Sequence, residues 1–240
     1  MPNPASLRSS PASPRVFLIT GASTGIGAST ARQAAAAGYR LVLGARSADK
    51  LAALAEELGG DEHALAVPCD VTEWPDQQAI MQKALDAYGR LDVVFANAGF
   101  GGARGFQEGT PEEWREMVLT NVYGVALTIR ASMDALKESR GPLLITSSVA
   151  GRRALKGSLY SATKHAVTAM GEAARLDFND SGVRVTLIEP GMTDTPFFDS
   201  PPQIEALKPD DIARAVMFAV SQPPHVDVNE ILIRPTAQPT

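Results

Sequence analysis

A glycine-rich turn behind a short apolar strand constrains the fold more than any other feature of this sequence. Residues 16–19 are all apolar, and glycines occupy positions 21, 25 and 27 directly after them. Because glycine has no Cβ, such a turn lets backbone amides and a helix N-terminus approach an anionic pyrophosphate. The spacing is G-x-x-x-G-x-G rather than the commoner G-x-G-x-x-G. The segment predicts a dinucleotide site, with a plain tight turn as the alternative.

Apolar strands and helical patterns alternate along the rest of the chain. Strands this apolar, separated by helices, are typical of a parallel sheet that is covered on both faces. We therefore expect the α/β class: a single doubly wound, Rossmann-type domain with a seven-stranded parallel sheet and helices on both faces. The predicted strands are 16–19, 41–43, 64–67, 93–95, 143–146, 183–188 and 230–233, and the predicted helices are 28–37, 48–58, 76–88, 111–137, 160–178 and 210–220.

Composition agrees with one enzyme-sized domain. The chain has 240 residues, of which 45% are hydrophobic, and a formal charge of −5, which argues against nucleic-acid binding. Cys69 is the single cysteine, so neither a disulfide nor a metal cluster is expected. We expect a flexible tail at 1–14, one catalytic domain at 15–240 with a short substrate loop at about 192–208, no membrane association, and a cytoplasmic location.

A tyrosine and a lysine stand four residues apart in a predicted helix, at Tyr160 and Lys164. Positions i and i+4 share one helix face, so the ammonium can lie beside the phenol. A phenol has an ordinary pKa of about 10, and a fixed cation lowers it. The pair predicts a tyrosine that donates or accepts a proton, although the same spacing also occurs on solvated helix faces.

Together with the glycine turn, this pair resembles the short-chain dehydrogenase/reductase family, in its compact branch of about 250 residues. The resemblance covers residues 15 to 236 and rests on motifs that follow one another along the chain in the order of the family. Beyond the turn and the pair, they are Asp70-Val71, Asn97-Ala98-Gly99, Asn121, Ser147-Ser148-Val149-Ala150-Gly151 and Pro190-Gly191-Met192-Thr193-Asp194-Thr195.

The resemblance implies an oxidoreductase and assigns roles to its residues. The catalytic set would be Asn121, Ser148, Tyr160 and Lys164, with Ser147 as the nearest rival of Ser148. Asn121 would hold a water that links Lys164 to solvent, and Lys164 would also hold the nicotinamide ribose. The cofactor-binding residues would be Gly21, Ser23, Thr24, Gly25, Ile26, Gly27, Arg46, Asp70, Val71, Asn97, Ala98, Gly99, Tyr160, Lys164, Pro190, Gly191, Thr193 and Thr195, and no metal is expected.

The end of the second strand bears on the choice of cofactor. Ala45 stands where an acidic residue would hold an adenosine 2′-hydroxyl, and Arg46, which can grip a 2′-phosphate, follows it. We therefore prefer NADP(H), with NAD(H) as the alternative. Thr24 stands where many NADP-preferring relatives have a second basic residue, and an arginine at a strand end is often only a solvated cap.

Three functions compete at this point. The first is an NADP(H)-dependent enzyme that interconverts a small-molecule carbonyl and an alcohol. The second is a noncatalytic dinucleotide-binding sensor or scaffold. The third, a sugar-nucleotide epimerase or dehydratase, is disfavoured because it needs a substantial carboxyl-terminal lobe. Residues 228–236 are similar to members that act on 3-hydroxy acids, and the family usually pairs its long helices into homodimers and homotetramers.

Substrate contacts are expected in the loops around the tyrosine. Phe197 and Phe198 would form an apolar cover, and Arg104, Arg152 and Arg153 are candidates to recognise a substrate carboxylate.

Overall fold

The computed structural model describes residues 13–197 and 204–238. The tail predicted at 1–14 therefore lies outside the described residues except for positions 13 and 14. The part of the predicted substrate loop from 198 to 203, which includes Phe198, also lies outside them.

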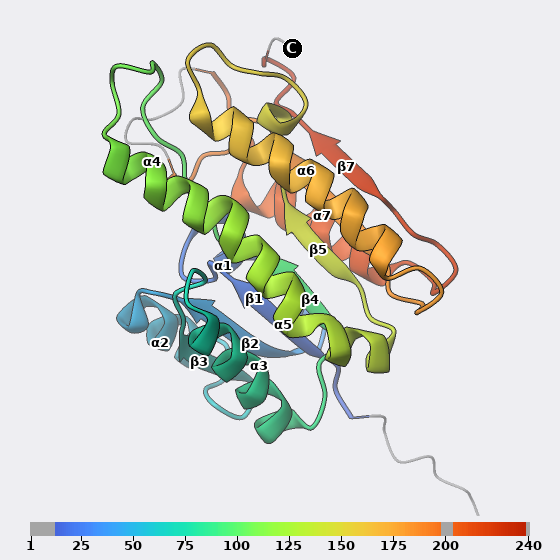
Figure 1. Ribbon diagram of the computed structural model, residues 1–240. Coiled ribbons are helices and arrows are strands. Elements are labelled where there is room, and N and C mark those ends of the chain that lie inside the picture. The colour runs from blue at the N-terminus through green and yellow to red at the C-terminus, as the bar shows by residue number, and fades with distance from the viewer. Residues whose placement is uncertain (1–12, 198–203, 239–240) are drawn as a thin grey trace, which may run out of the picture.

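A sheet of seven parallel strands forms the centre of the molecule (Figure 1). Its order is β3-β2-β1-β4-β5-β6-β7, so the chain builds outward from β1 to β3 and then returns to add β4 on the other side of β1. The carboxyl ends of β1 and β4 thus border the crevice where a doubly wound sheet binds ligands. The strands are β1 (Val16–Thr20), β2 (Arg40–Ala45), β3 (Ala64–Pro68), β4 (Val93–Ala96), β5 (Leu143–Thr146), β6 (Val185–Pro190) and β7 (Glu230–Ile233).

Helices cover both faces of this sheet, which confirms the predicted fold class. One hydrophobic core joins the sheet to α3, α5 and α6, and a second joins the opposite face to α1, α2 and α7. Every residue of β1 is buried, because successive side chains enter the two cores in turn. The helices are α1 (Gly25–Ala36), α2 (Ala48–Glu57), α3 (Trp74–Tyr88), α4 (Pro111–Val118), α5 (Gly124–Ser139), α6 (Leu159–Asp177) and α7 (Pro209–Ser221), with η1 (Leu119–Tyr123) and η2 (Val149–Gly151) as short π and 3-10 turns.

Several element boundaries differ from the sequence-based expectation. Helix α1 begins at Gly25 rather than at 28, since the last glycines of the turn already form its first helical turn. Helix α3 begins at Trp74 rather than at 76, with a proline in the first turn, where its missing N–H costs nothing. Strand β6 is shifted to Val185–Pro190.

The helix predicted from 111 to 137 is not continuous. Its start is as expected, because Thr110 accepts a hydrogen bond from the N–H of Glu113 while the Glu113 side chain bonds back to the N–H of Thr110. A π-helical turn at Leu119–Tyr123 then separates α4 from α5. Such turns insert one residue into the helix and redirect a side chain. Here the turn contains Asn121, which is fully buried.

Candidate active site

The glycine turn forms a cradle that only glycines fit. Gly21 has φ +65°, and a Cβ on it would lie 2.8 Å from the Cα of Ala98. A Cβ on Gly27 would overlap the carbonyl oxygen of Gly21, and one on Gly25 would lie 3.2 Å from Cγ2 of Thr195. The turn therefore brings β1, the loop after β4 and the loop after β6 into contact.

The N-terminus of α1 opens into this cradle. The N-cap residue Thr24 makes no side-chain capping bond, and the first turn of α1 contains no acidic residue. The first N–H groups of a helix have no partner within the helix, and the helix dipole favours an anion there. The cradle and the end of the helix together fit the pyrophosphate of a dinucleotide. Between the glycines lie Ser23, Thr24 and Ile26, which are partly exposed.

Arg46 and Asp70 lie at the ends of the neighbouring strands β2 and β3. Arg46 is exposed, and among the described residues it forms no ion pair. Asp70 is part-buried, and its Oδ1 accepts from the N–H of Thr72 at 2.9 Å and from the Thr72 hydroxyl at 2.8 Å. Val71, the next residue, is buried and packs beside Gly124.

Asn97 ties three strand ends together. Its Nδ2 donates to the carbonyl oxygen of Thr20 at 3.1 Å, and its Oδ1 accepts from the Thr146 hydroxyl at 3.0 Å. The ends of β1, β4 and β5 are thereby held in register. A Cβ on Gly99, two residues on, would lie 3.1 Å from Oδ1 of Asn121 and 3.6 Å from Nζ of Lys164. The Asn97-Ala98-Gly99 segment therefore passes directly beside the predicted catalytic residues.

The two serines after β5 face different neighbours. The hydroxyl of Ser147 lies 2.8 Å from that of Thr168 and donates to the carbonyl oxygen of Lys164, so it is used in packing against α6. The hydroxyl of Ser148 accepts from the N–H of Ala150 at 3.1 Å and donates to the carbonyl oxygen of Pro190 at 3.4 Å, and it lies close enough to Tyr160 to lower the pKa of the phenol. The structure brings Ser148, rather than Ser147, to the tyrosine.

Tyr160 and Lys164 lie on one face of α6, at its N-terminal end. The Nζ atom of Lys164 lies 5.7 Å from the centroid of the Tyr160 ring and donates to the carbonyl oxygen of Thr146 at 2.7 Å. Lys164 is 3% exposed. Hydrogen bonding to β5 therefore fixes a buried ammonium beside the ring.

Burial dominates the protonation of both groups. It raises the pKa of Tyr160 to about 12, against the lowering effect of the hydrogen bond with Ser148. It also lowers the pKa of Lys164 to about 8. We expected Lys164 to bring the pKa of the Tyr160 phenol below its ordinary value, and this expectation is wrong for this structure. Burial disfavours the phenolate more strongly than the groups around it favour it.

Asn121 is brought to the same place by the π turn. Its Oδ1 accepts from the N–H of Phe100 at 3.0 Å, and its Nδ2 donates to the carbonyl oxygen of Phe100 at 2.8 Å and to the Thr163 hydroxyl at 3.2 Å. The side chain thus fastens the loop after β4 to α6. The bond to Thr163 was not predicted, although its place before Lys164 puts Thr163 on the same helix.

The segment after β6 reaches the glycine cradle and the tyrosine. Thr195 contacts Gly25, as described above, and the ring of Phe197 lies edge-on to that of Tyr160, with 5.4 Å between the ring centroids. Phe197 also packs against Gly101, where a Cβ would lie 2.7 Å from its ring. Pro190, Gly191 and Thr193 precede it, and the side chain of Gln238 accepts from the N–H of Met192 at 2.8 Å. No feature of the sequence predicted that Gln238, near the C-terminus, would form a hydrogen bond with the loop after β6.

Arg152 is not available to a substrate. Its Nε donates to Glu189 at 2.7 Å, and its guanidinium also pairs with Glu230. The prediction that Arg152 recognises a carboxylate of the substrate is therefore wrong, since two acidic residues of β6 and β7 already occupy it. Arg104 and Arg153 are exposed.

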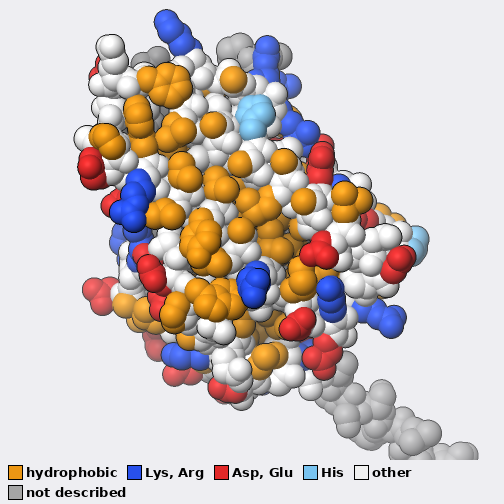
Figure 2. Space-filling model, in the orientation of Figure 1, with side chains coloured by type: hydrophobic (Ala, Val, Ile, Leu, Met, Phe, Trp, Pro, Cys, Tyr) orange, Lys and Arg blue, Asp and Glu red, His pale blue; other side chains and the backbone are white. Residues whose placement is uncertain are grey.

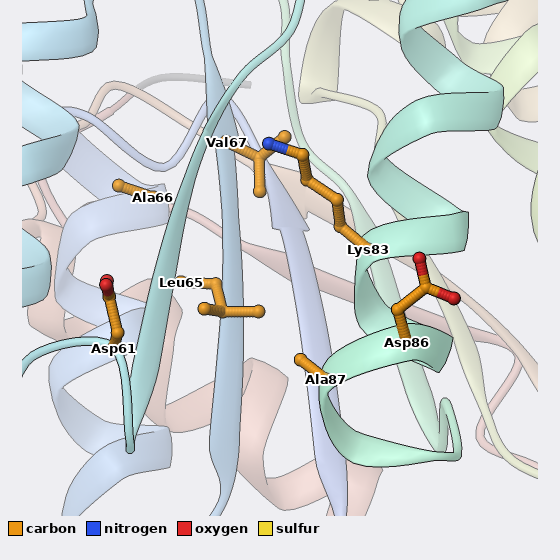
Figure 3. A pocket seen from close by; sticks show the side chains of 7 residues that line it. All are labelled: Asp61, Leu65, Ala66, Val67, Lys83, Asp86 and Ala87. Atoms are coloured by element: carbon orange, nitrogen blue, oxygen red, sulfur yellow. The ribbon is translucent and has the colours of Figure 1, made fainter.

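One hollow of the surface lies away from these residues. Figure 3 shows it between the edge strand β3 and α3, with a volume of about 410 Å³. None of the predicted site residues lines it, so it is separate from the site. The described residues contain no group of three or more His, Cys, Asp or Glu side chains that could hold a metal ion, and no helix among them is long and apolar enough to cross a membrane.

A glycine cradle, a tyrosine beside a buried lysine and a doubly wound sheet are together typical of a dinucleotide-dependent oxidoreductase. The family model for short chain dehydrogenases matches residues 15–205, and the chain belongs to that family. An uncharacterized oxidoreductase of Staphylococcus haemolyticus is 36% identical over 225 residues, which cover 92% of this chain and 97% of the relative.

Two solved structures are similar over almost the whole chain. An alcohol dehydrogenase from the archaeon Thermococcus sibiricus, complexed with 5-hydroxy-NADP, has a TM-score of 0.87 and 36% identity, with 94% of this chain and 98% of that chain covered. A 3-ketoacyl-(acyl-carrier-protein) reductase from Brucella melitensis, complexed with NADH, has a TM-score of 0.84 and 30% identity, with 92% and 96% covered. The chain therefore has the fold of this family over almost its whole length, and both neighbours were solved with a nicotinamide dinucleotide or an analogue of one bound.

Proposed function

We propose that the protein is an NADP(H)-dependent reductase that interconverts a small-molecule carbonyl and an alcohol, with Tyr160 as the proton donor in reduction and the acceptor in oxidation. The observation that carries the proposal is the meeting of Tyr160, Ser148 and Lys164 beside the glycine cradle. A nicotinamide cofactor supplies or takes up the hydride.

Ser148 and Tyr160 act on the oxygen of the substrate. The Ser148 hydroxyl donates a hydrogen bond to that oxygen and positions it against the Tyr160 hydroxyl. With a pKa of about 12, Tyr160 is protonated at neutral pH, which is the form needed to deliver a proton to the oxygen in reduction. In oxidation the phenolate form of Tyr160 accepts the proton from the alcohol.

Lys164 acts through its charge and its fixed position. Below its pKa of about 8 it is an ammonium ion beside the phenol, and this charge favours the phenolate that remains after proton transfer. We also assign to Lys164 the ribose of the cofactor, because its Nζ lies beside Gly99, in the segment that the resemblance makes part of the cofactor site. Asn121 keeps the loop after β4 in place through its side-chain bonds to Phe100 and Thr163, and in this proposal it also fixes the water that links Lys164 to solvent.

Arg46 supports the preference for NADP(H). It is an exposed guanidinium at the end of β2, beside the predicted place of the adenosine ribose, and the buried Ala45 before it has no acidic side chain to hold a 2′-hydroxyl. The turn at Asp70 uses only its Oδ1 atom, so we assign its other carboxylate oxygen to a hydrogen bond with the adenine of the cofactor. Thr195, which lies beside the cradle, is assigned to the carboxamide of the nicotinamide.

The test is the loss of NADPH absorbance with a panel of ketones, aldehydes and 3-oxo acids, run beside NADH, Tyr160→Phe and Arg46→Ala. We expect Tyr160→Phe to lose at least about 100-fold in kcat, since general acid catalysis contributes that much or more. Arg46→Ala should raise the KM for NADPH and leave that for NADH unchanged. A fully active Tyr160→Phe protein contradicts the mechanism, and equal rates of the wild type with the two cofactors contradict the role of Arg46.

The alternative is a dinucleotide-binding sensor or scaffold without catalysis. It predicts that NADPH binds with micromolar affinity while no carbonyl in the panel is reduced. The burial of Lys164 beside Tyr160 favours the enzyme, because burying an ammonium costs stability that binding alone does not require.

We also propose that two copies pair through the face formed by α5 and α6. Figure 2 shows hydrophobic side chains gathered on the face where Figure 1 shows α4, α5 and α6. Among the residues of α4 and of the π turn that follows it, Val118 is 41% exposed and Tyr123 is 46% exposed. The experiment is sedimentation at micromolar concentration, where a monomer would contradict the pairing.

A further inference from the structure

A second hollow lies between the loop that precedes α4 and the loop that precedes α6. Its volume is about 620 Å³, and it is lined by Arg104, Gly105, Phe106, Leu155, Lys156 and Gly157. The N–H of Gly105 donates to the carbonyl oxygen of Gly157 at 2.8 Å, and a Cβ on Gly157 would lie 2.8 Å from the Cα of Gly105. Both glycines have positive φ, at +117° and +62°. The two loops are therefore held together at a junction that side chains would separate.

The same two loops flank the catalytic tyrosine. In the second loop, the N–H of Leu155 donates to the hydroxyl of Ser161, and Gly157 stands three residues before Tyr160. In the first loop, Asn121 holds Phe100, and Gly101 contacts the Phe197 ring that packs on Tyr160. The two loops that line the hollow therefore also hold residues of the proposed substrate site.

Positive charge gathers at this hollow. Arg104 and Lys156 are both exposed, and neither forms an ion pair with any residue that the structure describes. The first turn of α6 contains no acidic residue, so its positive dipole end is not neutralised locally. Glu108, whose side chain lies against Gly105, is the nearby acidic group on the first loop and offsets part of this charge.

The remaining lining is apolar. Phe106 is 67% exposed, and Leu155 is part-buried on the opposite loop. Apolar walls with a few polar groups are typical of sites that hold a small organic molecule, and a volume of several hundred cubic ångströms accommodates more than a single anion.

We propose that this hollow selects carbonyl substrates whose far end carries a carboxylate, with Arg104 and Lys156 as the residues that recognise it. The proposal rests on the proposed reductase function. Arg104 offers a bidentate pair to a carboxylate, Lys156 adds a second cation, and Phe106 with Leu155 contacts an apolar spacer between the carboxylate and the carbonyl. Arg152, which is bound by two glutamates, takes no part.

The experiment compares a medium-chain oxo acid with its methyl ester, which has the same carbonyl and no charge. We measure kcat/KM with NADPH for the wild type, the double variant Arg104→Gln/Lys156→Gln, and the control Lys50→Gln, which removes an exposed charge on α2. We expect the wild type and the control to prefer the acid by at least about tenfold, as a charge-assisted pair warrants. The double variant should lose this preference and keep its kcat/KM for the ester within about twofold, and the preference should fall as salt rises.

Equal rates of the wild type with acid and ester, or equal losses with both substrates in the double variant, overturn the proposal while leaving the reductase function intact. If the wild type reduces neither substrate nor any other carbonyl of the panel, the reductase function itself fails and this proposal fails with it.

Discussion

Replacing Lys164 with methionine should stabilise the fold while abolishing activity. Lys164 is 3% exposed, and burial lowers its pKa from 10.5 to about 8. This difference corresponds to about 3 kcal/mol by which the fold disfavours the charged lysine at neutral pH. Methionine has a similar length and carries no charge, so the variant escapes this cost.

One loss opposes the gain. The hydrogen bond from Nζ to the carbonyl oxygen of Thr146 disappears in the variant, and a hydrogen bond of this kind is worth about 1 to 2 kcal/mol. We therefore expect the free energy of unfolding at pH 7 to rise by about 1 to 2 kcal/mol, or roughly 3 to 6 °C in Tm for a domain of this size.

The dependence on pH identifies the cause. Because the folded pKa of Lys164 lies below its unfolded value, the cost is present in full below pH 8 and disappears as pH rises from about 8 to 10.5. The advantage of Lys164→Met should shrink across that range. Groups that lie far from residue 164 contribute equally in both proteins and cancel in the difference.

The assay is urea unfolding of the wild type, Lys164→Met and the control Lys50→Met at pH 7, 8.5 and 10, at one protein concentration. Lys50 is exposed, so its replacement should change stability by less than about 0.5 kcal/mol at every pH. If Lys164→Met is less stable than the wild type at pH 7, with a difference that does not vary with pH, the reasoning from burial is refuted.

Three further outcomes follow from the contacts of the site. Gly27→Ala should destabilise the fold by about 1 to 3 kcal/mol and weaken NADPH binding, because the added Cβ would overlap the carbonyl oxygen of Gly21. Thermal unfolding measures the first effect and nucleotide fluorescence the second. Unchanged binding would contradict the role of the glycine turn as a cofactor cradle. Phe197→Ala should raise the KM for apolar carbonyls several-fold and leave the Kd for NADPH unchanged, since the Phe197 ring packs against Tyr160. An equal rise in the KM and in the Kd would show that Phe197 stabilises the fold instead. Arg152→Met should lower the free energy of unfolding at pH 7 by about 3 to 5 kcal/mol, because the buried Glu189 is left without its main ion-pair partner. Burial already raises the pKa of Glu189, so that cost should fall as pH drops and the carboxylate is protonated, and urea unfolding at pH 5 and 7 checks whether it does.

Much of the fold and of the cofactor cradle could be predicted because local pattern carries them. The apolar run of β1 and the glycines of the turn specify a strand, a tight approach and a helix start within about twelve residues, whatever surrounds them. The capping box at Thr110 and Glu113 is equally local, and it formed as expected. The π turn at Asn121 could not be read in this way, since it depends on what that side chain bonds across the molecule.

The sequence alone determined the family, the seven-stranded sheet and the meeting of Ser148, Tyr160 and Lys164 near one end of it, because strand order and helical spacing are properties of the chain. Only the tertiary structure decided how those groups ionise and which arginines are free. The pKa of Tyr160 and the pairing of Arg152 depend on burial and on partners from β6 and β7, far away along the chain. Solvation and long-range pairing arise when the elements pack, so spacing along the chain does not encode them directly.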